Sequence, residues 1–93
     1  MTASPLYRIE ISSPAARSLA RLPPKMCDAV LRFIEGPLSE NPMRATKPLG
    51  AELGDLRSGC VGIAYRVLVR IHLDEHLVQV MRIAHRADAY RRG

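Results

Sequence analysis

Two segments near the end of the chain show an alternating pattern of apolar and polar residues, and this pattern constrains the fold more than any other feature. They span residues 64–72 and 77–86, and the polar residues Asp74, Glu75 and His76 separate them. A period of two residues puts apolar side chains on one face of a β-strand and polar side chains on the other. The pattern therefore predicts a β-hairpin with one face packed against a second layer of structure.

The predicted hairpin collects arginines on its polar face. A loop centred on Glu75 gives a register whose opposed pairs include Arg66–Ala84, Leu68–Arg82 and Arg70–Val80. The polar face then carries Arg66, Arg70, Arg82 and Arg86. The core face carries Tyr65, Val67, Val69, Ile71, Met81 and Ile83. A shift of one residue would turn one strand's arginines into the core, at a large desolvation cost.

Four neighbouring arginines repel one another unless an anion neutralises them. The planar guanidinium of arginine binds phosphate through two parallel hydrogen bonds. We therefore expect this face to bind an anion such as a phosphodiester. The alternative is that the arginines only keep a solvent-exposed face soluble.

The first half of the chain predicts one strand and two helices. Residues 6–12 alternate, with Tyr7, Ile9 and Ile11 on the side expected to be buried. Ser12 or Ser13 then caps a helix that begins at Pro14 and ends near Leu22.

The double proline at residues 23–24 breaks this helix and opens a second one, which we expect to run to about Glu35. Its apolar stripe consists of Met26, Val30, Phe33 and Ile34. The pair Gly36-Pro37 is expected to end it. Residues 36–55 are rich in proline, glycine and polar residues, and predict a connection with one extended segment.

These elements predict an α+β fold: an N-terminal strand, an αα-hairpin, and then an antiparallel sheet of about three further strands with the helices on one face. We find no internal repeat and no change of composition, so we expect residues 1–93 to form a single domain. No apolar run approaches the ~20 residues that cross a bilayer, and the N-terminus lacks a secretory pattern. We therefore expect a cytoplasmic protein without membrane contact.

Cysteine and histidine usage does not predict a metal site. Cys27 and Cys60 are too few and too far apart for a disulfide scaffold or a zinc motif, so we expect both to be reduced packing residues. His72, His76 and His85 do not form a ligand spacing with them. We expect neither a metal nor another cofactor.

The charge balance points to an acidic partner. The chain has 14 basic and 9 acidic residues, a formal net charge of +5, and most of the excess lies after residue 43. Such a balance favours nucleic acid or an acidic protein. The last residues add His85, Arg86, Tyr90 and Arg91, a mixture of cations and an aromatic ring that suits RNA, whose bases stack on aromatic and guanidinium planes.

The order of these elements, combined with three motifs, resembles the RelE/ParE superfamily of type II toxins, and most closely its actinobacterial RelE-like branch. The motifs are Lys47-Pro48-Leu49, Tyr65-Arg66-Val67 and the terminal His85-Arg86-Ala87-Asp88-Ala89-Tyr90. The resemblance implies a metal-independent endoribonuclease that cleaves messenger RNA in the ribosomal A site by attack of the 2′ hydroxyl. It also implies a RelB-like antitoxin as partner, and a toxin–antitoxin hetero-oligomer on operator DNA.

The resemblance assigns roles to individual residues. It implies that Arg66 and Arg86 contact the scissile phosphate and that Tyr90 stacks on a base. His85 is a candidate general acid or base because an unperturbed imidazole titrates near neutral pH. The basic residues expected to bind RNA are Lys47, Arg57, Arg44, Arg70, Arg82 and Arg91.

One departure from the family pattern bears on activity. Cys60 and Val61 stand where the related toxins carry arginines, and one extra residue follows Gly62. Loss of one charge-stabilising group typically costs ~10²–10³-fold in rate. Two alternatives therefore stay open: a ParE-like gyrase inhibitor, and a degenerate, non-cleaving toxin that serves as an antitoxin-binding module.

Overall fold

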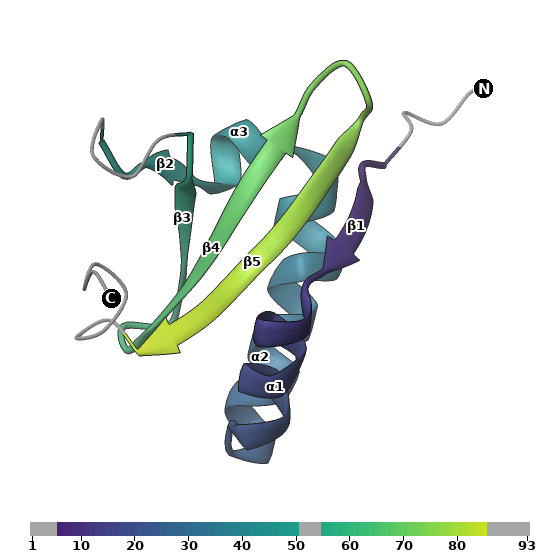
Figure 1. Ribbon diagram of the computed structural model, residues 1–93. Coiled ribbons are helices and arrows are strands. Elements are labelled where there is room, and N and C mark those ends of the chain that lie inside the picture. Colours follow the sequence, from purple (N-terminus) through teal and green to yellow (C-terminus); the bar gives the residue numbers. More distant parts are fainter. Residues whose placement is uncertain (1–5, 51–54, 86–93) are drawn as a thin grey trace.

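The computed structural model describes residues 6–50 and 55–85, which form a mixed five-stranded sheet with helices on one face (Figure 1). The strands are β1 (Arg8–Ile11), β2 (Lys47–Pro48), β3 (Arg57–Val61), β4 (Tyr65–His72) and β5 (Leu77–His85). The helices are α1 (Ser13–Arg21), α2 (Pro24–Phe33), the π-helix η1 (Ile34–Leu38) and α3 (Pro42–Ala45). The predicted α+β class is confirmed. None of the helices in the described residues is long and apolar enough to span a bilayer.

The strands follow the order β1-β5-β4-β3-β2 across the sheet. The segment from β2 to β5 is antiparallel throughout, whereas β1 pairs with β5 in parallel. The predicted hairpin, formed by β4 and β5, therefore lies at the centre of the sheet. Strand β2 is the extended segment expected within residues 36–55. The parallel pairing of β1 had no signal in the sequence pattern.

The predicted hairpin register is correct only up to a β-bulge. Arg66 pairs with Ala84 and Leu68 with Arg82, as predicted, but beyond Leu68 the register shifts by one residue. Arg70 consequently faces Gln79, and the predicted pairing of Arg70 with Val80 is wrong.

The bulge has a packing cause. Val78, Val80 and Ile83 are all buried in the core, although Val80 and Ile83 are three residues apart and would point to opposite faces of a regular strand. One extra residue between them lets both face inward. Val80, predicted to lie on the arginine side, is fully buried instead, and Met81, predicted to face the core, lies at the bulge and is only half-buried.

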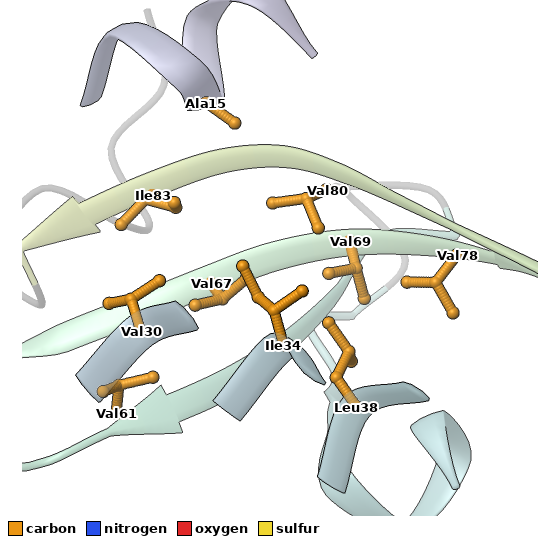
Figure 2. Packing of buried hydrophobic residues seen from close by; sticks show 10 residues of the cluster. All are labelled: Ala15, Val30, Ile34, Leu38, Val61, Val67, Val69, Val78, Val80 and Ile83. Atoms are coloured by element: carbon orange, nitrogen blue, oxygen red, sulfur yellow. The ribbon is translucent and has the colours of Figure 1, made fainter. Parts of the chain in front are cut away.

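The core lies between the sheet and the helices, where α1 runs along β5 and α2 along β3. Figure 2 shows Val30, Ile34 and Leu38 pointing toward the apolar face of β4. Val67 and Val69 on that strand are fully buried. Burying a side chain of this size stabilises the fold by about 1.5–3 kcal/mol.

Ser12 joins the start of α1 to the bulge. Its hydroxyl oxygen accepts a hydrogen bond from Ala15 N at 3.2 Å, as a helix cap does, and its hydroxyl donates to Met81 O at 2.8 Å. Of the two predicted caps, Ser12 is thus the correct one. The same contact satisfies a backbone carbonyl of the irregular part of β5.

The prediction that Gly36-Pro37 ends the second helix is wrong. The chain stays helical to Leu38, but as the wider π-helix η1. A wider turn leaves room for the Pro37 ring, which in an α-helix would collide with the carbonyl four residues earlier. This continuation brings Leu38, which is fully buried, into the core.

Strand β1 is held at the sheet edge by the hairpin loop. Tyr7 stacks on His76 with ring centroids 3.7 Å apart, and Arg8 N donates to His76 O at 2.9 Å. Tyr7 and Ile9 pack against the core as predicted. Ile11, predicted to be buried, is 40% exposed because the edge strand ends there and the chain turns into α1.

Gly59 provides a test of the packing between α2 and β3. A Cβ atom at Gly59 would lie 2.5 Å from Cζ of the Phe33 ring, so the ring packs directly on the strand backbone. We expect Gly59→Ala to lower the free energy of unfolding by about 1–3 kcal/mol, measured by urea denaturation. Gly36→Ala is the matched control, since a Cβ there meets nothing within 4 Å. Equal stability of the two variants would contradict this packing.

Candidate functional site

The sheet face opposite α1 and α2 carries the basic side chains of the strands. Because Val67 and Val69 point to the core, strand alternation sends Arg66 and Arg70 to the other side. We call this surface the arginine face and define its cations, within the described residues, as Lys47, Arg66, Arg70 and Arg82. The prediction that Arg66, Arg70 and Arg82 share a face is confirmed.

Three of these cations surround one small buried patch. A continuous row crosses four strands in the order Lys47, Ser58, Leu68 and Arg82. Ser58 and Leu68 are 8% and 5% exposed and form a floor between the two cations at the ends of the row. The next row contains Arg66, which is therefore a diagonal neighbour of Arg82, with Cα atoms about 7–8 Å apart.

This arrangement suits a phosphate group. Cations at the rim of a low-dielectric floor attract an anion more strongly than isolated surface charges do. The Arg66 guanidinium is oriented in part by its own strand, since Nη1 donates to Tyr65 O at 3.2 Å. The arrangement can therefore hold a phosphodiester over Leu68 within reach of more than one cation.

Ser58 also belongs to this floor, although it was not among the predicted site residues. Its hydroxyl oxygen is buried and has no hydrogen-bond partner in the structure as described. It lies between Lys47 and Leu68 in the row. The alternation of Ser58 and Cys60 along the short strand β3 was the signal that could have placed it there.

Arg70 lies further along β4 and already has a partner. Its Nε is 3.1 Å from Oδ1 of Asp55, and both side chains are largely exposed. Beside it, Gln79 bonds to His72 at 2.8 Å and donates to Glu10 at 3.4 Å. This end of the arginine face is thus a polar network.

Arg57 has a structural position on the other side of the sheet. Its Nε donates to Thr46 Oγ1 at 2.8 Å, and Nη2 donates to Thr46 O at 2.9 Å and to Met43 O at 3.1 Å. Thr46 in turn donates to Pro42 O at 2.7 Å. Arg57 therefore fixes α3 and β2 to β3, and the structure does not bring it to the arginine face.

Arg44 is also separate from the arginine face. It lies on α3 and lines a shallow hollow of about 390 Å³ formed by residues of η1, α3 and the turn between them. The other lining residues are Pro37, Glu40, Asn41 and Ala45.

The structure describes His85, but not the other candidate site residues near the end of the chain. His85 pairs with Tyr65 in the register and contacts its ring edge-on, at a centroid distance of 5.6 Å. Since Tyr65 packs against the core, His85 points away from Arg66. Arg86, Tyr90 and Arg91 lie outside the described residues, so their roles stay predictions.

Cys60 and Val61, which depart from the family pattern, lie on opposite faces of the sheet. Cys60 was predicted to be a packing residue, but it is exposed on the arginine face directly opposite Arg66. Val61 is 6% exposed and belongs to the core. Strand alternation explains the error for Cys60, because only every second residue of β3 can face inward. Cys27 is half-buried on α2, and both thiols are free.

Two curated proteins with sequences similar to this chain are both toxins from one organism. No protein-family model matches the chain. It is 42% identical over 86 residues to Toxin RelG of Mycobacterium tuberculosis, covering 92% of this chain and 98% of the relative. It is also 42% identical over 85 residues to Toxin RelE of that organism, covering 91% and 87%.

Solved structures show the same fold. The toxin–antitoxin complex RelBE2 from Mycobacterium tuberculosis matches with a TM-score of 0.82 and 36% identity, covering 95% of this chain and 100% of that chain. The isolated RelE toxin of E. coli matches with a TM-score of 0.68 and 15% identity, covering 85% and 83%.

The contacts of Arg57 predict a loss of stability on substitution. Arg57→Gln removes its hydrogen bonds to Thr46 and Met43, and we expect the free energy of unfolding to fall by about 1–3 kcal/mol in urea denaturation. Arg82→Gln, which changes an exposed side chain, should stay within about 0.5 kcal/mol of the parent. If both variants were equally stable, the anchoring role of Arg57 would be wrong.

Proposed function

The chain belongs to the RelE superfamily of type II toxin–antitoxin toxins, and from this membership we propose that it is a ribosome-dependent endoribonuclease that cleaves messenger RNA. The observation that carries the proposal is the group of three cations, Lys47, Arg66 and Arg82, around the apolar floor at Leu68. A message held in the ribosomal A site presents its phosphodiester backbone to this surface. The proposed site of action is therefore the cytoplasm.

The proposed reaction is attack of a ribose 2′ oxygen on the adjacent phosphorus. The bond from the 2′ oxygen to phosphorus forms as the 2′ hydroxyl gives up its proton to solvent water. The bond to the 5′ oxygen breaks and that oxygen takes a proton from solvent, which leaves a 2′,3′-cyclic phosphate and a free 5′ hydroxyl. The transition state carries additional negative charge on the phosphoryl oxygens. Arginines positioned in advance stabilise that charge, and this is the role we assign to Arg66 and Arg82.

The remaining roles follow the family resemblance. Arg86 is proposed to contact the same phosphate and Tyr90 to stack on a neighbouring base. Lys47 and Arg91 are proposed to hold the RNA backbone. Because His85 points away from Arg66, the proposed reaction assigns it no proton transfer on the arginine face. The proposed cleavage uses no metal ion, since the arginines supply the charge stabilisation.

A RelB-type antitoxin is the partner that the relatives support. The structures similar to this chain include RelE–RelB complexes from E. coli and Pyrococcus horikoshii. An acidic antitoxin segment laid over the arginine face would neutralise its cations and block RNA. We further propose that the resulting hetero-oligomer binds operator DNA.

One observation favours a second candidate, a weakly cleaving or non-cleaving toxin that acts mainly as an antitoxin-binding module. Two of the positions closest to Arg66 and Leu68 on β3 are the uncharged Ser58 and Cys60. The family pattern places an arginine at Cys60. A site with fewer cations stabilises the transition state less.

Substitution of the central arginine tests the proposed cleavage. The purified toxin is added to ribosomes programmed with a defined message, and the new 5′ ends are mapped. We expect Arg66→Gln to lower the cleavage rate ~10²–10³-fold, because it removes one stabilising cation from the scissile phosphate. Arg17→Gln on α1 is the control and should cleave like the parent. No cleavage by the folded, antitoxin-free parent would favour the antitoxin-binding module or a ParE-like gyrase inhibitor.

The two departures from the family pattern predict opposite effects of an added arginine. Cys60→Arg adds a cation opposite Arg66, the fourth in the group formed by Lys47, Arg66 and Arg82. We therefore expect faster cleavage in the same assay, about tenfold or more. Val61→Arg buries a charge in the core, so we expect it to unfold or strongly destabilise the protein in urea denaturation. A Cys60→Arg variant that is folded but no faster would show that this position does not limit the rate.

A further inference from the structure

The cationic residues of the arginine face differ in their surroundings. Arg66 and Arg82 lie beside the apolar floor at Leu68, and Arg70, further along β4, forms an ion pair with Asp55. Asp55 comes from the turn just before β3, so a residue from outside the hairpin reaches over to the face. This pair lies on the surface where the proposed substrate binds.

Within the described residues, the side chain opposite Arg70 does not compete with Asp55 for it. Gln79, the residue opposite Arg70 in the register, uses its side-chain oxygen for His72 and its side-chain nitrogen for Glu10. The Asp55 carboxylate thus provides the compensating charge that the structure shows at Arg70, at 3.1 Å.

The position of Arg70 suits a second phosphate. It lies four residues from Arg66 on the same face of β4, which corresponds to about 13 Å along the strand. An extended RNA strand that has one phosphate at Arg66 spans this distance within a few nucleotides. A phosphodiester also offers arginine the two parallel hydrogen bonds that its guanidinium favours.

We propose that Arg70 is a second phosphate-binding position of the arginine face and that Asp55 occupies it in the free toxin. This inference rests on the proposed function. An RNA phosphate binds Arg70 only by displacing the Asp55 carboxylate. The exchange is feasible because both side chains are exposed, at 45% and 77%, and exposed ion pairs are weak.

Displacing Asp55 from Arg70 costs free energy and therefore weakens RNA binding at this position. An RNA that is already bound at Arg66 overcomes this cost most easily. The other phosphates of that RNA then have a high effective concentration at Arg70, as for any second contact made by a tethered ligand. A single phosphate group from solution lacks this advantage. RNA strands that run along β4 therefore displace Asp55 more readily than isolated anions do.

A double-mutant cycle on Asp55 and Arg70 tests the proposal. The probe is a fluorescent ten-nucleotide RNA with 2′-O-methyl groups, which has no free 2′ hydroxyl and is not cleaved, and binding is followed by fluorescence anisotropy at low salt. We expect Asp55→Asn to raise the affinity about two- to fivefold, since exposed ion pairs of this kind have about that effect on an equilibrium. In an Arg70→Gln background, Asp55→Asn should raise the affinity no more than its change in net charge alone does.

The ion pair between Asp28 and Arg32 on α2 offers a matched control. It also joins an exposed aspartate to an exposed arginine, at 3.0 Å, and lies on a helix rather than on the arginine face. Asp28→Asn makes the same change in net charge and should raise the affinity less than Asp55→Asn does. Equal gains from the two variants, or an equal gain from Asp55→Asn with and without Arg70, would overturn the proposal. So would the absence of any gain.

The cleavage assay separates this proposal from the proposed function. If the parent cleaves programmed messages and Arg66→Gln does not, while the cycle shows no coupling between Asp55 and Arg70, only the present inference fails. If Arg66→Gln cleaves as fast as the parent, the proposed function fails whatever the cycle shows.

Discussion

Burial of the alternate residues of β4 and β5 against the helices is the constraint on which the rest of this structure depends. Val67, Val69, Val78 and Val80 are fully buried, and their burial fixes the register of the two central strands. Because side chains alternate along a strand, the same register sends Arg66 and Arg70 to the side of the sheet opposite the helices. The arginine face is therefore a direct consequence of how the core packs, and a change of register would lose both the core packing and this face.

Much of this architecture is predictable from local pattern. The hairpin, the Ser12 cap and the apolar stripe of α2 each follow from residues close together in the sequence. The predictions of local structure are wrong where contacts between residues distant in the sequence determine the conformation. The bulge at Met81 satisfies core packing against α1 and α2, and the helical path through Gly36-Pro37 brings Leu38 into the core. The parallel pairing of β1 with β5 likewise depends on tertiary contacts such as that between Tyr7 and His76.

The site was predictable to a similar degree. Arginines on one strand face are visible in the sequence, but their partners are not: the ion pair of Asp55 with Arg70 joins residues whose proximity follows only from the sheet. The pattern also does not reveal that the Arg57 guanidinium turns toward Thr46 and Met43. A basic residue in a suspected RNA-binding protein can equally be a structural anchor, and hydrogen-bond geometry distinguishes the two.

The central claim is that RNA binds the arginine face, and mapping the contact by NMR tests it most directly. The ¹⁵N-labelled protein would be titrated with the 2′-O-methyl RNA while the backbone amide shifts are followed. The account predicts that the largest changes fall on Ser58, Cys60, Arg66, Leu68 and Arg82, and that the exposed residues of α1 and α2 stay unchanged. Changes concentrated on those helices, or on the hollow beside Arg44, would contradict it.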